Sequence, residues 1–466
     1  MKLTINLDKT KAIVFSKGYT QDNKLPKFLY NGEVIEFTKS YKYLGVEFQQ
    51  NSKFKDVIKM RILKAQNAIY AINRACSTEC TSSIHTRKKL FESKVFPILT
   101  YGCAIWGTMT NNRLKFQQDG DIIKENIKTE FNNLGIQIQD IRTNRTNKSL
   151  GSFSCPTYDE KLFLLQSPEI RTKLQLESPP FSNHHHKIET FLNISIKKLL
   201  GIKKCANNSL TRMHIGWKPI SISMWMAAVK YWLRTHQPTD NLLLEAAYKE
   251  MHTSNSQWKD SIQHILCSNG MQQMWEFPLL NNMQGAQKYI KTRLLDIEIQ
   301  KSLTEITESK KISKILKYIT IDTQTNELPN YHNLISDPIH KKTITKLRTH
   351  THCLQTETGS YTNETDINKY NCPKCSMKVP EDAAHFLLIC PWNKYVTSRA
   401  SLINHLEAYT TLNRFTQHTA LTKALLDCEL GTPPPEKLQN IYSIIHKMYK
   451  LREKEPWEVH PSISPS

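Results

Sequence analysis

The sequence predicts a mainly α-helical fold with a small β element near its N-terminal end. Between residues 3 and 48, short apolar runs alternate with polar and turn residues, which is the pattern of β-strands. From Ser52 onwards, apolar residues recur at helical spacing, which is the pattern of amphipathic helices. A group of cysteine and histidine residues between Cys372 and Cys390 adds a candidate metal centre to this mainly helical chain.

The N-terminal β element carries signals in three places. Ala12-Ile13-Val14-Phe15 is a short apolar run and predicts a buried strand. Asn31-Gly32 lies between two apolar runs, which is a strong signal for a β-hairpin. Tyr41-Lys42-Tyr43-Leu44-Gly45-Val46 predicts one further strand. Because nothing precedes the strand at residue 3, we expect this sheet to be the end of a domain that begins upstream.

Two helical runs follow the β element. The first extends from Phe54 to Ile72, and the second begins near Thr86 and is broken or kinked at Pro97. Between residues 53 and 94, ten basic residues stand against three acidic ones, a net charge of +7. Such helix faces are most often simply solvated. Because acidic partners at i,i+4 spacing are scarce here, we favour contact with nucleic-acid phosphates. The expected contacts are Lys59, Arg61, Lys64, Arg87, Lys88 and Lys89.

The overall composition points to a polyanionic partner. The chain has 466 residues, enough for two or three domains, and a formal charge of +21. That charge favours nucleic acid or an anionic membrane surface. No apolar run is long enough to span a membrane, no signal peptide is recognisable, and the eleven cysteines lack disulfide-framework spacing. We therefore expect a soluble intracellular protein, in the nucleus or in a cytoplasmic ribonucleoprotein, that binds RNA or DNA and no membrane.

Four segments in the first 106 residues share their order and spacing with one protein family. They are Lys2–Lys11, Asn31–Glu36, Tyr41–Gly45 and Phe96–Gly102. This part of the chain resembles the reverse transcriptases of non-LTR (LINE-like) retrotransposons. The resemblance implies that the first segment closes the polymerase palm, that the third belongs to the primer grip and that the following helices form the thumb. It also implies that Tyr43, Leu44 and Gly45 lie against the primer strand and that Lys9 or Lys11 faces the nucleotide site.

The chain departs from this family at the catalytic residues. Polymerases of this kind use two metal ions held by aspartates, one of them in an Asp-Asp box just before the palm segment. The sequence contains no two adjacent aspartates. The two aspartates that come nearest to such a box, Asp119 and Asp121, lie in a polar loop, and we do not expect them to be catalytic. We therefore predict binding of template or primer without polymerisation and assign no catalytic residue. Magnesium would bind only if an upstream polymerase or endonuclease portion of the element supplied the catalytic half.

The middle of the chain divides into two predicted regions. Residues 108–186 are polar and irregular, and we expect a partly disordered insertion. Residues 187–350 are expected to form a basic helical domain whose first helix ends at Gly201. Three tryptophans at helical spacing, Trp217, Trp225 and Trp232, are interpreted as core rather than as surfaces for base stacking. The candidate nucleic-acid contacts of this domain are Lys197, Lys198, Lys203 and Lys204.

The C-terminal region contains the strongest chemical signal. Cys372-Pro373-Lys374-Cys375 has the spacing of a metal-binding turn, and His385 and Cys390 complete four ligands within nineteen residues. Thiolate and neutral imidazole suit tetrahedral zinc, so we predict one structural zinc ion on Cys372, Cys375, His385 and Cys390. The alternative is that these cysteines are small buried hydrophobic residues. By resemblance this is the zinc knuckle of the same family. Residues expected to present to nucleic acid here are Lys374, Lys378, Trp392 and Lys394.

The sequence thus predicts six consecutive regions. They are residues 1–50 (palm remnant), 51–107 (thumb-like helices), 108–186 (insertion), 187–350 (basic helical domain), 351–400 (zinc-knuckle region) and 401–466 (helical tail with a disordered end). The favoured function is that of a nucleic-acid-binding C-terminal fragment of a retrotransposon RNA-directed DNA polymerase, inactive by itself. The alternative is a decayed transposon reading frame whose product is a poorly folded interaction or structural protein.

Overall fold

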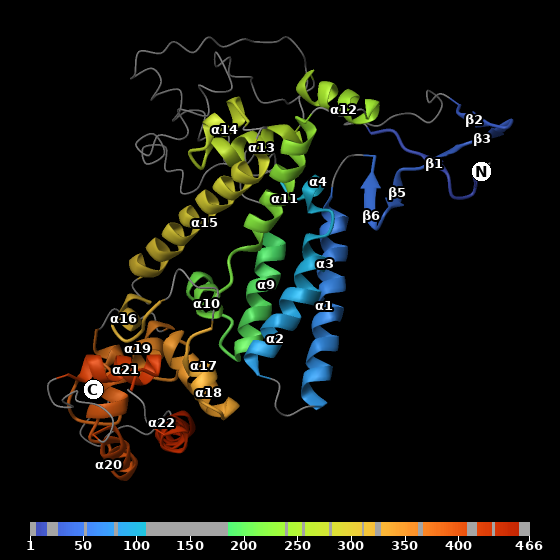
Figure 1. Cartoon of the computed structure of the whole chain (residues 1–466). Helices are drawn as coiled ribbons and strands as arrows, with labels where there is room; N and C mark the ends of the chain where they lie inside the picture. The colour runs from blue at the N-terminus through green and yellow to red at the C-terminus, as the bar shows by residue number, and fades with distance from the viewer. Residues whose placement is uncertain are drawn as a thin grey trace, which may run out of the picture. The chain divides into compact units, whose positions relative to one another are not determined.

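Figure 1 shows the computed structural model of the 466-residue chain. It describes residues 6–15, 27–50, 54–78, 83–108, 185–237, 241–253, 257–278, 282–309, 312–321, 328–361, 367–407, 417–430 and 434–455. Four predictions lie outside these residues: the start of the strand at residue 3, most of the insertion, the pair Asp119 and Asp121, and the disordered end after residue 455.

The described part of the chain is mostly helical with a few small sheets, which confirms the predicted mainly α class. It forms two compact units, each built from three segments. Unit 1 consists of Met1–Val57, Gly102–Ile188 and Ile220–Arg293, and unit 2 consists of Ile58–Tyr101, Glu189–Pro219 and Leu294–Ser466. The six-region division stays a prediction. None of the described helices combines the length and the apolar composition that a membrane crossing requires.

The strands of unit 1 pair two by two. β1 (Lys11–Ala12) runs parallel to β4 (Glu36–Phe37), β2 (Leu29–Tyr30) is antiparallel to β3 (Glu33–Val34), and β5 (Ser40–Tyr43) is antiparallel to β6 (Val46–Gln49). The hairpin predicted at Asn31-Gly32 is confirmed. Both turn residues have positive φ, 51° and 84°, as a type I′ turn requires.

Two strand predictions are wrong. Tyr41–Val46 is not one strand, because Leu44 and Gly45 form the turn between β5 and β6 with φ of 45° and 79°. Glycine at position 45 adopts a positive φ without steric cost, which allows the turn. The turn was not predicted because the apolar side chain of Leu44 fits the pattern of a strand. Ala12–Phe15 is not a buried strand either, since β1 ends at Ala12 and Phe15 is exposed.

The helical part of unit 1 is organised around α11 (Ile220–Thr235). Figure 1 shows this helix beside α4 (Cys103–Trp106) and α13 (Gln257–Cys267), with which it packs. Trp232 of α11 is buried and stacks on Trp275 at 5.2 Å between ring centroids, so the interpretation of Trp232 as core is confirmed. The unit also contains α12 (Leu242–Thr253), α14 (Gln272–Glu276) and the start of α15 (Met283–Glu308).

Unit 2 contains most of α1 (Lys55–Thr78), which the apolar period predicts. After α2 (Ile84–Leu90) the chain passes through a π-helical turn, Phe91–Val95, into α3 (Phe96–Thr100). Phe96 N–H bonds to the carbonyl of Phe91, five residues back, directly before Pro97, which has no N–H to donate. The irregularity predicted at Pro97 is therefore present as a π-helical turn.

The next two helices of unit 2 are α9 (His185–Leu200) and α10 (Asn208–Ile215). α9 ends at the predicted residue, because Gly201 has φ of 66° and the amide of Ile202 bonds back to the carbonyl of Lys197. Trp217, just after α10, is buried against Phe91 and Phe96, which confirms that it belongs to the core.

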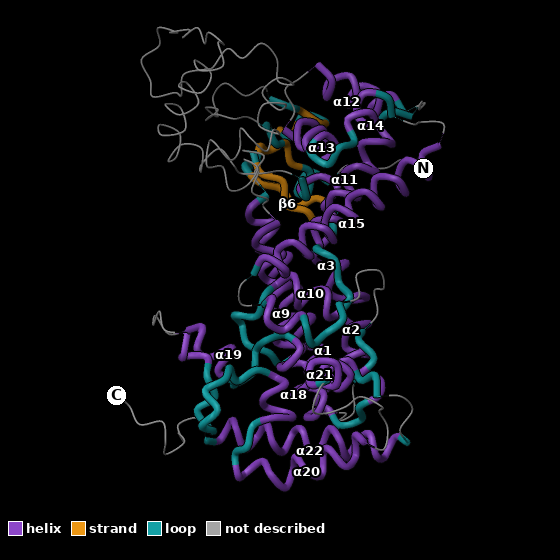
Figure 2. Tube along the Cα trace, turned by 90° about the vertical axis from the view of Figure 1, so that its left-hand side faces the viewer, coloured by secondary structure: helices purple, strands orange, loops and turns teal. Residues whose placement is uncertain are grey.

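The C-terminal part of unit 2 has one continuous apolar core. Figure 2 shows the two long helices α20 (Asn393–Glu407) and α22 (Pro435–Lys454) side by side. Helix α22 lies in the predicted helical tail. The smaller elements are α16 (Ser313–Leu316), α17 (Tyr331–Leu334), α18 (Pro338–Arg348), α19 (Gln355–Thr358) and α21 (His418–Asp427). The predicted metal ligands lie in this core.

Candidate metal centre

The structure brings the four predicted metal ligands together. The candidate ligand atoms of Cys372, Cys375, His385 and Cys390 all lie within 4.8 Å of one another, and all four residues are buried. Cys372 Sγ is 3.8 Å from Cys390 Sγ, and Cys375 Sγ is 3.4 Å from His385 Nε2. The spacing in the sequence therefore predicts a real cluster in space.

A short β-bridge forms the turn that carries the first two ligands. Asn371 pairs with Pro380, and the amide of Cys372 donates to the carbonyl of Val379 at 2.8 Å. Lys378 takes a positive φ of 51°, which closes the turn. The amide of Lys374 points at Cys372 Sγ at 3.4 Å, so a backbone dipole already faces the sulfur. We call residues 371–390 the knuckle.

The other two ligands lie at the two ends of a π-helical turn, His385–Ile389. Asp382 fixes its start, because its Oδ1 accepts the amide of His385 at 2.9 Å. At its end the amide of Cys390 bonds to the carbonyl of His385 at 2.8 Å, five residues back. This wider turn brings the His385 ring and the Cys390 sulfur to the same cluster.

The donor set and its spacing fit zinc. Zinc bonds of about 2.3 Å to sulfur and about 2.0 to 2.1 Å to nitrogen give tetrahedral edges of about 3.8 Å between sulfurs and about 3.6 Å between sulfur and nitrogen. The distances of 3.8 Å and 3.4 Å are close to these edges. Three sulfurs and one imidazole fill all four positions and leave none for a substrate, so the site suits a structural ion.

The protons within the cluster are unevenly held. The hydrogen bond from the Cys372 thiol lowers the pKa of Cys390 to about 4, and the same hydrogen bond raises the pKa of Cys372. Burial raises the pKa of Cys375. A metal ion binds cysteine as the thiolate, so the sulfurs that carry protons release them when a cation binds. Metal binding at this site is therefore coupled to pH.

Arg399 of α20 supports the second half of the knuckle. Its guanidinium donates to the carbonyls of Phe386 at 3.0 Å and Leu387 at 3.2 Å, and also to the carbonyl of Cys390. These carbonyls end the π-helical turn and have no helical partners. Burial lowers the pKa of Arg399, and the nearby Cys390 partly opposes this effect. Arg399 therefore fixes the ligand-bearing backbone and places a positive charge near the sulfurs.

Two residues that were expected to present to nucleic acid are buried, so that prediction is wrong for them. Lys374 is 1% exposed and Trp392 is 6% exposed. Lys374 Nζ donates to the carbonyl of Glu455 and lies 4.8 Å from the centroid of the Trp392 ring. The lysine between the two first ligands thus holds the end of α22, while Lys378 and Lys394 remain exposed.

A buried ion pair completes the attachment of the knuckle to α22. Glu381 accepts Nε of Arg452 at 2.7 Å and Nη2 at 2.9 Å, and both side chains are almost fully buried. Lys394 Nζ also binds the Glu455 carboxylate at 2.6 Å. The sequence analysis missed Glu381 and Arg452. They are 71 positions apart and match no spacing rule.

The predicted nucleic-acid contacts in unit 1 are mostly exposed. Lys9, Tyr43 and Leu44 are exposed and Gly45 is half-buried, whereas Lys11 forms an ion pair with Glu36 at 2.5 Å across β1 and β4. Tyr43, Leu44 and Gly45 lie together at the turn between β5 and β6. The roles of these residues in binding nucleic acid stay predictions.

The predicted contacts in unit 2 divide into three groups by exposure. Three are buried and have internal partners: Arg61 over the Tyr101 ring, Lys88 near Glu92, and Lys197 on the carbonyl of Lys204. Arg87 is half-buried. The exposed ones are Lys59, Lys64, Lys89, Lys198, Lys203 and Lys204. Of these, Lys203 forms an ion pair with the buried Glu357 at 2.6 Å.

Comparisons with known proteins yielded no relative: no family model, no curated protein and no solved structure matches this chain.

Proposed function

We propose that this chain is a nucleic-acid-binding protein in which one structural zinc ion fixes the C-terminal region. In this proposal it corresponds to the C-terminal portion of a non-LTR retrotransposon reverse transcriptase and binds template or primer without catalysing polymerisation. The resemblance of the first 106 residues supports the family, and the exposed face of α1 is the single observation that supports the binding.

The exposed face of α1 combines basic and large apolar side chains. Lys59, Leu63, Tyr70 and Arg74 fall within about 60° of the helix circumference at 100° per residue. All four are exposed, and the two large apolar ones strongly so, with Leu63 at 58% and Tyr70 at 72%. The opposite face carries the buried residues Ile58, Ala65 and Ile72. We call the four exposed residues the α1 stripe.

The composition of the α1 stripe fits a nucleic-acid backbone better than a second apolar surface. Lysine and arginine at its two ends can each meet a phosphate, and the tyrosine between them can stack on a sugar or base. The remaining exposed cations of the same unit, such as Lys64 and Lys89, enlarge the positive field without adding apolar area. The formal charge of +21 acts in the same direction.

Salt dependence tests this proposal directly. The full chain is titrated into fluorescently labelled single-stranded RNA and an RNA–DNA duplex at several salt concentrations, and binding is followed by fluorescence anisotropy. If Lys59, Arg74 and their neighbours neutralise phosphates, the binding constant falls steeply with salt, with a slope of about 0.7 to 0.9 per phosphate contact. Binding that does not change between 50 and 200 mM salt, or no binding at all, contradicts the proposal.

One observation favours the second candidate, a non-enzymatic interaction or structural protein. The hairpin of β2 and β3 exposes apolar side chains, with Leu29 at 63% and Val34 at 57% exposure. Exposed apolar patches commonly contact other proteins. A chain that binds no nucleic acid, unfolds without cooperativity and aggregates supports this candidate, whereas cooperative unfolding together with salt-dependent binding supports the first.

A further inference from the structure

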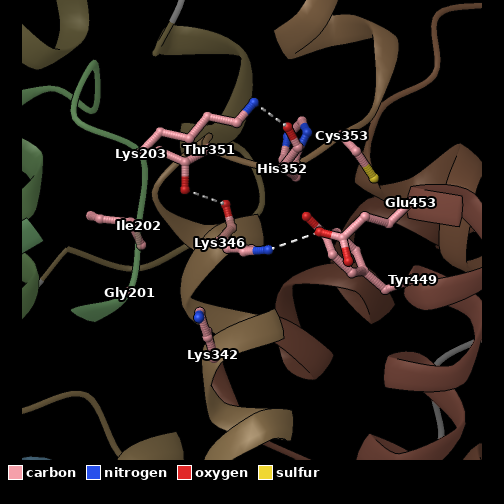
Figure 3. A pocket seen from close by; sticks show the side chains of 10 residues that line it. All are labelled: Gly201, Ile202, Lys203, Lys342, Lys346, Thr351, His352, Cys353, Tyr449 and Glu453. Atoms are coloured by element: carbon pink, nitrogen blue, oxygen red, sulfur yellow. Dashed lines mark hydrogen bonds and ion pairs between the residues drawn. The ribbon is translucent and has the colours of Figure 1, made fainter. Parts of the chain in front are cut away.

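A pocket of about 290 Å³ lies in unit 2, apart from the metal centre. Figure 3 shows its lining, which comes from the loop after α9, from α18 and the loop that follows it, and from α22. The residues that matter for its chemistry are Gly201, Lys203, Lys342, Lys346, His352 and Glu453. Three of these six carry ammonium groups, so the pocket has a cationic wall.

Two of the three lysines are partly compensated. Lys203 Nζ donates to the carbonyl of His352 at 3.0 Å and binds the Glu357 carboxylate at 2.6 Å. Lys346 Nζ is 3.1 Å from Glu453, the acidic residue of the lining. Glu453 is itself shared, because Lys450 binds its other oxygen at 2.6 Å. Among the lining residues, the three ammonium groups of Lys203, Lys342 and Lys346 stand against the one carboxylate of Glu453, which leaves about two positive charges at the pocket.

Lys342 is the lysine without a compensating group. It is exposed, and among the described residues its side chain makes no hydrogen bond or ion pair. Its side chain packs against Gly201: a Cβ at position 201 would lie 2.7 Å from Lys342 Cε and 3.2 Å from Lys342 Nζ. Glycine at the end of α9 thus leaves the space that this side chain occupies at the pocket wall.

Binding of backbone carbonyls near helix ends does not explain why all three lysines line the pocket. Cations often bind the unpaired carbonyls at a helix C-terminus. Lys203 binds the carbonyl of His352, in the loop that follows α18, and its position is explained in the same way. Lys346 is explained by Glu453. Lys342 lies one turn before Lys346 in α18, and in the described part of the chain its ammonium group has neither a carboxylate nor a carbonyl as partner.

From this charge balance we infer that the pocket binds a phosphate monoester, with its dianion between Lys342 and Lys346. The charge of such a group, about −1.5 to −2 at neutral pH, matches the surplus of the wall. The volume is close to the lower limit for small-molecule pockets, about 300 Å³, and leaves room for the group that carries the phosphate. This inference does not depend on nucleic-acid binding by the α1 stripe. A free metabolite and the terminal phosphate of an oligonucleotide share the required chemistry.

The test combines chemical protection with matched variants of the full chain. Lysines are acetylated with limiting acetic anhydride, with and without inorganic phosphate or adenosine 5′-monophosphate, and the yield at each lysine is read by mass spectrometry. Adenosine is the probe that lacks phosphate. Calorimetric titrations of the same probes are repeated on Lys342→Gln, Lys342→Arg and the control Lys447→Gln, which changes an exposed lysine of α22 outside the pocket.

We expect phosphate and adenosine 5′-monophosphate, but not adenosine, to protect Lys342 and leave Lys447 unchanged. Lys342→Gln weakens binding about tenfold, as expected for loss of one charged hydrogen bond, while Lys342→Arg retains it. A further titration compares oligonucleotides with a 5′-phosphate and a 5′-hydroxyl: preference for the former identifies a nucleic-acid end as the source, and equal binding identifies a free monoester. Unchanged acetylation of Lys342, or equal weakening by Lys342→Gln and Lys447→Gln, overturns the inference.

Discussion

The α1 stripe and the knuckle contain similar residues and use them in opposite ways. The stripe has a tyrosine between a lysine and an arginine, all exposed. The knuckle and the residues after it have Lys374 and Trp392, both buried. Lysine next to an aromatic residue therefore does not by itself indicate a surface for nucleic acid.

The difference lies in the acceptors that each lysine can reach. Lys374 meets the carbonyl of Glu455 at the end of α22, where helix carbonyls lack partners and a cation is favourable. Glu381 of the knuckle meets Arg452 one turn earlier. The knuckle thus serves to attach α22 to the core, and its zinc would stabilise this attachment rather than contact a ligand.

Among the changes that distinguish the knuckle from the α1 stripe, removal of a metal ligand is expected to have the largest effect. Cys375→Ser should abolish zinc binding and unfold the knuckle, because the free energy of metal binding is also folding free energy there. Metal analysis by mass spectrometry should fall from one zinc per chain to none, and amide exchange should speed up in residues 371–390 and at the end of α22. Cys205→Ser, which changes an exposed cysteine outside the cluster, should keep the zinc. Full zinc content in Cys375→Ser would contradict the assigned ligand set.

Breaking the ion pair of the knuckle with α22 should have the next largest effect. Arg452→Met leaves the Glu381 carboxylate buried without its partner, which costs about 3 to 5 kcal/mol of the free energy of unfolding. Urea unfolding of the zinc-loaded chain measures this loss. The double variant Arg452→Met/Glu381→Leu should recover part of it, since no buried charge remains. A single variant as stable as the parent would mean that α22 is not held through this pair.

A buried histidine of α17, His332, predicts that the stability of the C-terminal part of unit 2 depends on pH. Burial lowers the pKa of His332 to about 3, and neither ring nitrogen has a hydrogen-bond partner among the described residues. The unfolded chain, with a histidine pKa of about 6.5, binds a proton that the folded chain does not. The contribution of His332 to the free energy of unfolding is therefore complete above about pH 6.5 and is lost as the pH falls towards 3, with a loss of about 2 kcal/mol at pH 5.

His332→Leu isolates this contribution. Between pH 7 and pH 5, the free energy of unfolding of the variant should fall by about 2 kcal/mol less than that of the parent, as measured by thermal unfolding at each pH. Because it also removes two unpaired polar atoms from the core, it should not be less stable at pH 7. An identical pH profile in variant and parent would refute the assignment to His332.

The contrast also shows what the sequence can predict. Local patterns predict the hairpin at Asn31-Gly32, the end of α9 at Gly201 and the four ligands of the metal centre, since each depends on neighbours within a few residues or on chemically specific spacing. The turn at Leu44-Gly45 escaped detection because a leucine rarely takes a positive φ. The fate of Lys374 and the pairing of Glu381 with Arg452 depend on residues about 70 to 80 positions away, whose approach only the tertiary fold decides.

The smallest expected effect is a change in RNA affinity, which should differ between variants of the α1 stripe and variants of the knuckle region. Lys59→Gln/Arg74→Gln should weaken RNA binding about tenfold at low salt and reduce the salt slope by about 1.4 to 1.8, because two phosphate contacts are lost. The matched pair in the knuckle region, Lys378→Gln/Lys394→Gln, removes two exposed charges of the same kind. The ion pair between Lys394 and Glu455 is partly exposed and contributes little to stability. If this second pair weakened RNA binding more than the first, the knuckle would contact nucleic acid after all, through the two lysines that α22 leaves exposed.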